Sequence, residues 1–137
     1  MIQQGSEAWK QLRLGKVTAS RVADVVAKTK SGWSASRANY MAQLVAERLT
    51  GVCQDSYVSA AMQHGTDTET LARAAYEFHA DTDVSLIDFV DHPKIVMAGA
   101  SPDGCIDDGG LVEIKCPATA THITTLLGAN IDGKYVK

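Results

Sequence analysis

The sequence predicts an α/β (α+β) fold in which helices come first, a three-stranded antiparallel meander follows and one more helix closes the chain. Three observations support this prediction. The chain has 137 residues with 45% apolar and 21% charged side chains, which is typical of one folded domain, here residues 1–137. Apolar residues in the first half recur at helical spacing. Residues 84–116 instead alternate with a period of two and are rich in β-branched side chains.

Two helices are predicted in the first 51 residues. Thr18 or Ser20 is expected to cap a short helix, which ends before a break at residues 30–32. Ser36 is expected to open a longer helix. Gly51 follows this helix at the position where a left-handed residue ends many helices.

A third helix is expected to begin near Thr66, because Thr66 and Glu69 have the spacing of a capping box. The periodicity predicts one inward-facing apolar stripe on this helix. The stripe consists of Leu71, Ala74, Ala75 and Phe78.

Strands follow this helix. Residues 84–90 and 94–100 are predicted to pair through a turn, and residues 111–116 form the third strand after a glycine-rich hairpin at 107–110. Pro117 suits the first turn of a last helix that runs to about residue 127.

Composition excludes several classes of protein. No apolar run approaches the roughly 18 residues that a membrane span needs, and the N-terminus has no hydrophobic stretch that would indicate a signal peptide. The three cysteines include no CxxC pair, which indicates reduced thiols and a cytoplasmic location.

Charge is distributed unevenly along the chain. Residues 1–50 contain eight Lys and Arg against three Asp and Glu, whereas the remainder contains five against 13. A basic region beside an acidic one fits a protein that holds phosphate with the first and a metal with the second. Chance patterning of a solvated surface is the alternative interpretation.

The third predicted strand places Glu113 and Lys115 on one face and Ile114 on the other. An ion pair on a solvated face is one interpretation of this pattern. Asp103 favours a second interpretation, in which Glu113 belongs to a cluster of carboxylates, because Asp103 ends the preceding strand and a tight hairpin joins it to Glu113. The two carboxylates are then expected to converge at one sheet edge beside Lys115.

Two carboxylates and the Ile114 carbonyl form an all-oxygen set suited to Mg²⁺ or Mn²⁺. Such an ion activates water for phosphodiester hydrolysis, and Lys115 could orient that water or neutralise developing charge. For Asp103 the alternative interpretation is a turn former within residues 101–104.

Four sequence blocks in order carry a resemblance to a known family. They are Trp9-x3-Arg13-Leu14-Gly15-Lys16-Val17-Thr18-Ala19-Ser20, His64-Gly65-x3-Glu69, Gly99-Ala100-Ser101-Pro102-Asp103-Gly104 and Leu111-Val112-Glu113-Ile114-Lys115-Cys116-Pro117. Over nearly its whole length the chain resembles the lambda-type, YqaJ-like viral exonucleases of the PD-(D/E)xK nuclease superfamily. The resemblance implies a restriction-endonuclease-like core.

The resemblance also implies roles for individual residues. Asp103, Glu113 and the Ile114 carbonyl match the metal ligands, and Lys115 matches the catalytic lysine. Glu69 matches a helical glutamate that completes the metal environment, although its capping-box role is the alternative.

Three further residues match a pocket for the terminal 5′-phosphate of DNA. These are Arg13, Ser20 and Ser101. A guanidinium binds phosphate oxygens bidentately, and hydroxyls complete such a pocket. For Arg13 the alternative is a surface cation near Trp9.

The implied function is a Mg²⁺-dependent 5′-to-3′ exonuclease on double-stranded DNA ends in phage-type recombination, located in the cytoplasm of a bacterial host. A homotrimer and a single-strand annealing protein are the implied partners. Family members continue beyond the position of Lys137, so the C-terminal part of the fold is expected to be missing. The alternatives are a non-catalytic module that binds DNA ends or a partner protein, and a PD-(D/E)xK endonuclease.

Overall fold

The computed structural model describes residues 2, 4–54, 59–107, 109–128 and 131. The chain divides into two compact units. The first consists of Met1–Asp55 and Leu86–Pro102, and the second of Ser56–Ser85 and Asp103–Lys137. Each unit combines helices with short strands, as the sequence predicts.

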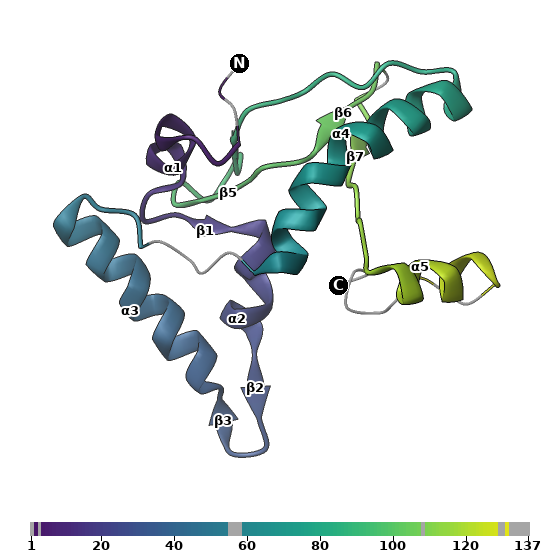
Figure 1. Cartoon of the computed structure of the whole chain (residues 1–137). Coiled ribbons are helices and arrows are strands. Elements are labelled where there is room, and N and C mark those ends of the chain that lie inside the picture. The colour runs from purple at the N-terminus through teal and green to yellow at the C-terminus, as the bar shows by residue number, and fades with distance from the viewer. Residues whose placement is uncertain (1, 3, 55–58, 108, 129–130, 132–137) are drawn as a thin grey trace. The chain divides into compact units, whose positions relative to one another are not determined.

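The first unit contains most of the elements. They are α1 (Glu7–Arg13), β1 (Val17–Thr18), the 3₁₀ turn η1 (Ala19–Arg21), α2 (Val22–Val26), β2 (Lys28–Thr29), β3 (Gly32–Trp33), α3 (Ala35–Thr50), β4 (Val90–Asp91) and β5 (Ala98–Ala100). Helix α2 packs against α3, and the β2–β3 hairpin connects them (Figure 1).

Helix α3 confirms the predicted long helix with one correction. It begins after Ser34, whose Oγ accepts a hydrogen bond from the Ser36 amide at 3.2 Å, so Ser36 lies inside the helix. Ser34 has the extended backbone that an N-cap needs. Gly51 ends the helix in the left-handed conformation, as predicted, with φ 69°.

The three-stranded sheet of the first unit has the order β1-β5-β4. Strands β4 and β5 are antiparallel, as expected of residues 84–100, but both are shorter than predicted. The third strand is β1, which runs parallel to β5 with Val17 opposite Ala98. The prediction that Thr18 or Ser20 caps the short helix is wrong, because Thr18 lies in β1, Ser20 lies in η1, and α2 begins after Arg21 without a side-chain cap. A strand of two residues such as β1 shows no period from which it could be predicted.

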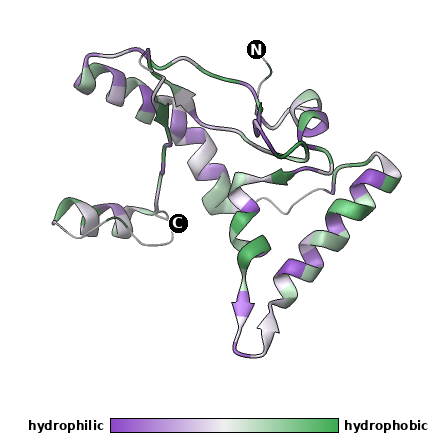
Figure 2. Cartoon of the chain, turned by 180° about the vertical axis from the view of Figure 1, so that it is seen from behind, coloured by the Kyte–Doolittle hydropathy of each residue, from purple (hydrophilic) through white to green (hydrophobic). Residues whose placement is uncertain are grey.

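The predicted break at residues 30–32 is the turn of a hairpin. Strand β2 pairs with β3, with Lys28 opposite Trp33. The cationic groups of Lys28 and Arg37 lie 4.7 and 4.0 Å from the centre of the Trp33 ring, which is 56% exposed. Figure 2 shows the change from the apolar ribbon of α2 to polar β2.

The second unit contains α4 (Ala60–Ala80), β6 (Gly104–Cys105), β7 (Leu111–Val112) and α5 (Thr119–Leu126). Helix α4 begins after Ser59, whose Oγ accepts a hydrogen bond from the Met62 amide at 3.2 Å. Thr66 therefore lies inside the helix and donates to the Met62 carbonyl at 3.2 Å. The predicted capping box is wrong, and Glu69 has no capping role.

The predicted inward stripe of α4 is also wrong. Leu71 and Phe78 are 72% and 92% exposed, and the stripe as a whole does not face inward. The half-buried face carries polar groups that make hydrogen bonds. For example, Glu77 accepts the Val84 amide at 2.8 Å. The half-buried face of α4 is therefore largely polar, in contrast to the predicted apolar stripe.

Strands β6 and β7 form an antiparallel hairpin with Gly104 opposite Val112. The third strand predicted for the meander thus pairs with β6 and lies outside the β1-β5-β4 sheet. Val84 packs on this hairpin, and a Cβ at Gly104 would lie 2.3 Å from its Cγ1 atom. Gly104 is therefore required by close approach.

Residues 111–116 keep the predicted alternation although β7 ends at Val112. The exposed set is Leu111, Glu113 and Lys115, and the half-buried set is Val112, Ile114 and Cys116. Helix α5 lies within the range predicted for the last helix.

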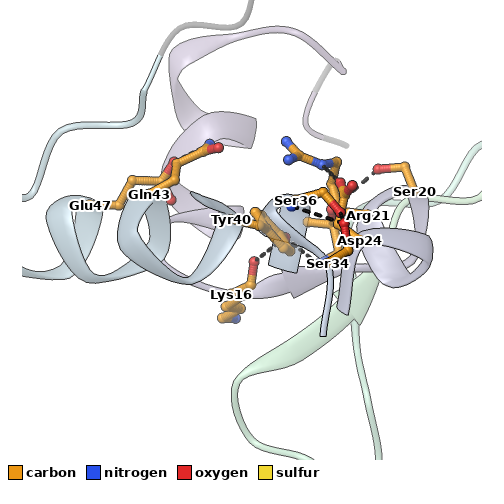
Figure 3. Close-up of polar contacts among 10 residues, drawn as sticks. Lys16, Ser20, Arg21, Asp24, Ser34, Ser36, Tyr40, Gln43 and Glu47 are labelled. Carbon is orange, nitrogen blue, oxygen red and sulfur yellow. Dashed lines mark hydrogen bonds and ion pairs between the residues drawn. The ribbon is translucent and has the colours of Figure 1, made fainter. Parts of the chain in front are cut away.

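Helix α3 holds the loop after α1 at Gly15. The Gly15 amide donates to Glu47 Oε2 at 2.9 Å, and Arg48 Nε donates to the Gly15 carbonyl at 2.8 Å. The Glu47 side chain projects from the same helix as Tyr40 (Figure 3), and both are 4% exposed. Tyr40 Oη accepts the Thr18 amide at 3.2 Å. These bonds position the segment that contains Arg13 and Ser20.

Gly15 cannot be replaced without disturbing this contact. Its φ of 65° disfavours any side chain, and a Cβ would lie 2.5 Å from Arg48 Cγ. We expect Gly15→Ala to lower the free energy of unfolding by about 1–3 kcal/mol in urea denaturation. Gly5→Ala is the matched control, because Gly5 also has a positive φ, 84°, but a Cβ there would meet no heavy atom within 4 Å. Equal losses in the two variants would contradict the role of Arg48.

Candidate functional site

Trp9 connects two residues of the predicted phosphate pocket. The Arg13 guanidinium lies over the Trp9 ring, 3.8 Å from its centre. Trp9 Nε1 donates to Ser101 Oγ at 3.1 Å. The stack that the alternative interpretation of Arg13 expects is therefore present, and it also brings Arg13 near Ser101 in the first unit.

Arg13 is half-buried. Burial lowers its pKa, while the neighbouring Cys53, Tyr40 and Glu47 act in the opposite direction. Ser20 lies on η1 and is exposed, and its Oγ is 3.2 Å from Thr18 Oγ1. The three predicted pocket residues thus belong to one unit, but the contacts described join only Arg13 and Ser101, through Trp9.

The predicted metal ligands lie around the open end of the β6–β7 hairpin in the second unit. Asp103 precedes β6, and its Oδ2 accepts the Ile114 amide at 2.6 Å across the hairpin. Asp103 therefore does more than form a turn, because it holds the chain where β7 ends. Lys115 Nζ forms an ion pair with Glu113 Oε1, as the solvated-face interpretation expects.

Glu69 faces this hairpin from α4. Its Oε1 accepts Arg73 Nη2 at 2.6 Å, one helical turn further along. Burial raises the pKa of Glu69, and repulsion from Asp103 and Glu113 raises it further, against the effect of Arg73. The structure thus brings the three predicted carboxylates within electrostatic range of one another.

Asp103 lies in the same electrostatic environment as Glu69. Burial raises its pKa and Glu113 raises it further, while the Ile114 hydrogen bond, Lys115 and Arg73 oppose the shift. The thiol of Cys116 responds to the same field, because burial and then Glu69 and Asp103 raise its pKa. The carboxylates therefore make this region negative despite the two cations.

The donor chemistry of this region fits a hard divalent cation. Three carboxylates that repel one another are stabilised when a cation lies between them, and oxygen ligands suit Mg²⁺ or Mn²⁺. Within the described ranges, however, no group of three or more His, Cys, Asp or Glu side chains is close enough to hold an ion. The side chains would have to close further around a metal.

The YqaJ-like viral recombinase domain matches residues 8–137 of the chain. The chain belongs to this family. No protein among those with curated descriptions matches the sequence. None of the helices described has the length and apolar content needed to cross a membrane.

Solved structures of an alkaline exonuclease from Laribacter hongkongensis, LHK-Exo, are similar to the chain. Its crystal structure shares 50% sequence identity with a TM-score of 0.81, covering 96% of this chain and 63% of that one. The complex of LHK-Exo with dAMP gives the same identity and TM-score and is covered over 64%. These matches confirm the predicted α+β nuclease fold. The chain spans less than two thirds of the length of these exonuclease chains.

Three residues of these two regions were not predicted from the sequence. Nothing in the sequence marks Glu47 as the buried acceptor for Gly15, because the pair is distant along the chain. Trp9 is recognised only as part of a block. Arg73 could have been found, since Glu69 and Arg73 have the i,i+4 spacing and order that favour a helical ion pair.

The raised pKa of Asp103 predicts the effect of removing its charge. In metal-free buffer at neutral pH we expect Asp103→Asn to raise the Tm, because the amide oxygen still accepts the Ile114 amide while the cost of burying the charge and the repulsion from Glu113 disappear. Screening limits the gain to below about 1 kcal/mol. The wild-type penalty exists above the raised pKa and is lost as pH falls through it, so the difference should vanish near about pH 4. Thermal melts in the presence of EDTA measure the Tm difference at neutral pH and its loss at low pH. Asp107→Asn, at an exposed position, is the control.

Proposed function

We propose that the chain is the nuclease domain of a metal-dependent DNA exonuclease that acts in recombination. The substrate is double-stranded DNA with a 5′-phosphorylated end, from which one strand is digested in the 5′-to-3′ direction. One observation carries the proposal: Asp103, Glu113 and Glu69 lie within electrostatic range of one another in a chain that is 50% identical to an alkaline exonuclease.

Asp103, Glu113, Glu69 and the Ile114 carbonyl would hold Mg²⁺ or Mn²⁺. The ion supplies Lewis-acid chemistry, which lowers the pKa of water and stabilises charge on the phosphoryl oxygens. Asp103 also binds the Ile114 amide, so one residue orients the backbone that carries a further proposed ligand. Lys115, paired with Glu113, places an ammonium where it can orient water or neutralise developing charge.

Arg13, Ser101 and Ser20 would bind the terminal 5′-phosphate. A guanidinium offers two parallel donors to phosphate oxygens, and stacking on Trp9 restricts the orientation of that fork. Ser101 keeps its hydroxyl hydrogen for a phosphate oxygen, because Trp9 donates to its Oγ. Recognition of one end of the strand is the physical basis for a fixed direction of digestion.

The homotrimer, the annealing-protein partner, the single-domain organisation over residues 1–137 and the cytoplasmic location remain predictions. So do the preference for Mg²⁺ and the phage origin. The family resemblance supports the trimer and the annealing protein, and the cysteine content supports the location.

Glu113→Ala and Lys115→Ala test the assignment of the nuclease site. With Mg²⁺ and linear 5′-phosphorylated duplex DNA, each variant should cleave about 100-fold more slowly than wild type or worse. Gel assays of strand loss measure the rates, and exposed Asp107→Asn provides a control that should cleave normally.

The same assay separates the other functions. Unchanged cleavage in both alanine variants would contradict the site. Metal binding by the wild-type chain with no cleavage at any Mg²⁺ concentration would favour a non-catalytic module. Cutting of covalently closed circular DNA would support an endonuclease, because an end-dependent enzyme leaves it intact.

Arg13→Gln tests the phosphate pocket. We expect wild type to cleave a 5′-phosphorylated duplex end faster than a 5′-hydroxyl end. In the variant the ratio of these two rates should be about tenfold smaller, because a charged hydrogen bond to the phosphate is removed. Arg13→Lys should retain part of it, since an ammonium keeps the charge without the fork. Equal preference in wild type and Arg13→Gln would contradict the role of Arg13.

A further inference from the structure

Arg73 is a half-buried cation of the second unit to which the proposed chemistry gives no role. It lies on α4, one turn after Glu69, with a side chain that is only 14% exposed. Its Nη2 donates to Glu69 Oε1 at 2.6 Å. The position is therefore defined by a short charged hydrogen bond to a proposed metal ligand.

Of the two donors on the Nε–Nη2 edge of the Arg73 guanidinium, only one makes a hydrogen bond among the described residues. The Nε–H and one Nη2–H of an arginine point in the same direction, and together they match two oxygens of a carboxylate or phosphate. Nη2 is bound to Glu69, whereas Nε is buried and has no hydrogen-bond partner among the described residues. Because buried donors are normally paired, this one marks a place where an acceptor arrives.

The surroundings indicate which kind of acceptor this is. Arg73 lowers the pKa of both Glu69 and Asp103, so it faces carboxylates from two different elements. The three carboxylates are coupled electrostatically to two cations, Arg73 on α4 and Lys115 after β7. Beside a metal ion, an anionic substrate entering this negative region would gain from a cationic donor, and Nε of Arg73 is a buried donor without a hydrogen-bond partner among the described residues.

We propose that Arg73 is a substrate-binding residue of this site, whose Nε donates to an oxygen of a DNA phosphodiester while its Nη2 holds Glu69. The inference rests on the proposed nuclease function, which supplies the phosphate. The competing explanation is that the second oxygen of Glu69 closes the fork, so that Arg73 only positions Glu69.

Salt dependence distinguishes the two explanations. A phosphate contact releases counterions, so removing it lowers the slope of log affinity against log salt concentration by about one. A residue that only positions Glu69 contributes nothing to this slope. It would instead affect metal binding, since residues that orient ligands change metal affinity by about 10- to 100-fold.

The experiment measures binding of a labelled 5′-phosphorylated duplex by fluorescence anisotropy over a range of salt. Lys115→Ala serves as the parent, since cleavage is then suppressed. Adding Arg73→Gln should weaken binding about tenfold and reduce the slope by about one. Adding Arg73→Lys should leave the slope unchanged, because the ammonium remains a point charge for phosphate. Lys94→Gln, an exposed cation elsewhere, is the control expected to keep the parent slope.

Each other outcome overturns the inference. Parent affinity and slope in the Arg73→Gln variant, together with weakened Mn²⁺ binding by calorimetry, would make Arg73 a positioning residue. Far-UV circular dichroism checks folding, and Arg73→Met replaces Arg73→Gln if the latter unfolds, since it removes the charge without a new buried polar group. If the parent binds no duplex and wild type cuts none, the proposed function fails as well. Cutting by wild type with an unchanged slope contradicts the Arg73 inference alone.

Discussion

The first unit depends on the hydrogen bonds between two side chains of α3 and the backbone of Gly15. Glu47 and Arg48 are consecutive on the helix, yet they bind the amide and the carbonyl of the same residue. Glu47 Oε1 also accepts Gln43 Nε2 at 3.1 Å and the Gln54 amide at 3.3 Å, so the buried carboxylate has partners on both oxygens. A buried charge is tolerated only when it is bound in this way. The contact therefore fixes the loop that leads from Arg13 to Ser20.

The two units use charge for different purposes. In the first, Arg13 is stacked on Trp9 and pairs with no carboxylate at hydrogen-bond distance in the described contacts, which leaves its donors available to an anion. In the second, like charges are gathered on α4 and on the β6–β7 hairpin, where burial and, to a smaller extent, mutual repulsion raise the pKa of Glu69 and Asp103. That arrangement costs stability in the free protein, and a bound cation would relieve the cost. Arg73 and Lys115 reduce the repulsion without removing it.

Some parts of this structure could be predicted because they depend on neighbours in the chain. The cap at Gly51 and the alternation of Glu113, Ile114 and Lys115 are local consequences of backbone conformation. The capping box at Thr66 failed although its spacing was right, because Ser59 starts the helix earlier and places Thr66 inside it. The inward stripe of α4 failed because the half-buried face of the helix carries Glu69, Arg73 and Glu77 instead of the predicted apolar residues.

The sequence by itself determined the residue types, their order and their spacing, and these were sufficient to predict the family, the fold class and the proposed ligands Asp103 and Glu113. Tertiary structure alone decided that β1 pairs with β5, that Trp9 links Arg13 to Ser101 and that Nε of Arg73 is buried without a partner among the described residues. The physical reason is the separation along the chain of the residues that make contact. Spacing along the chain specifies contacts within a helical turn or a hairpin, whereas burial and pairing between distant segments exist only after the chain has folded.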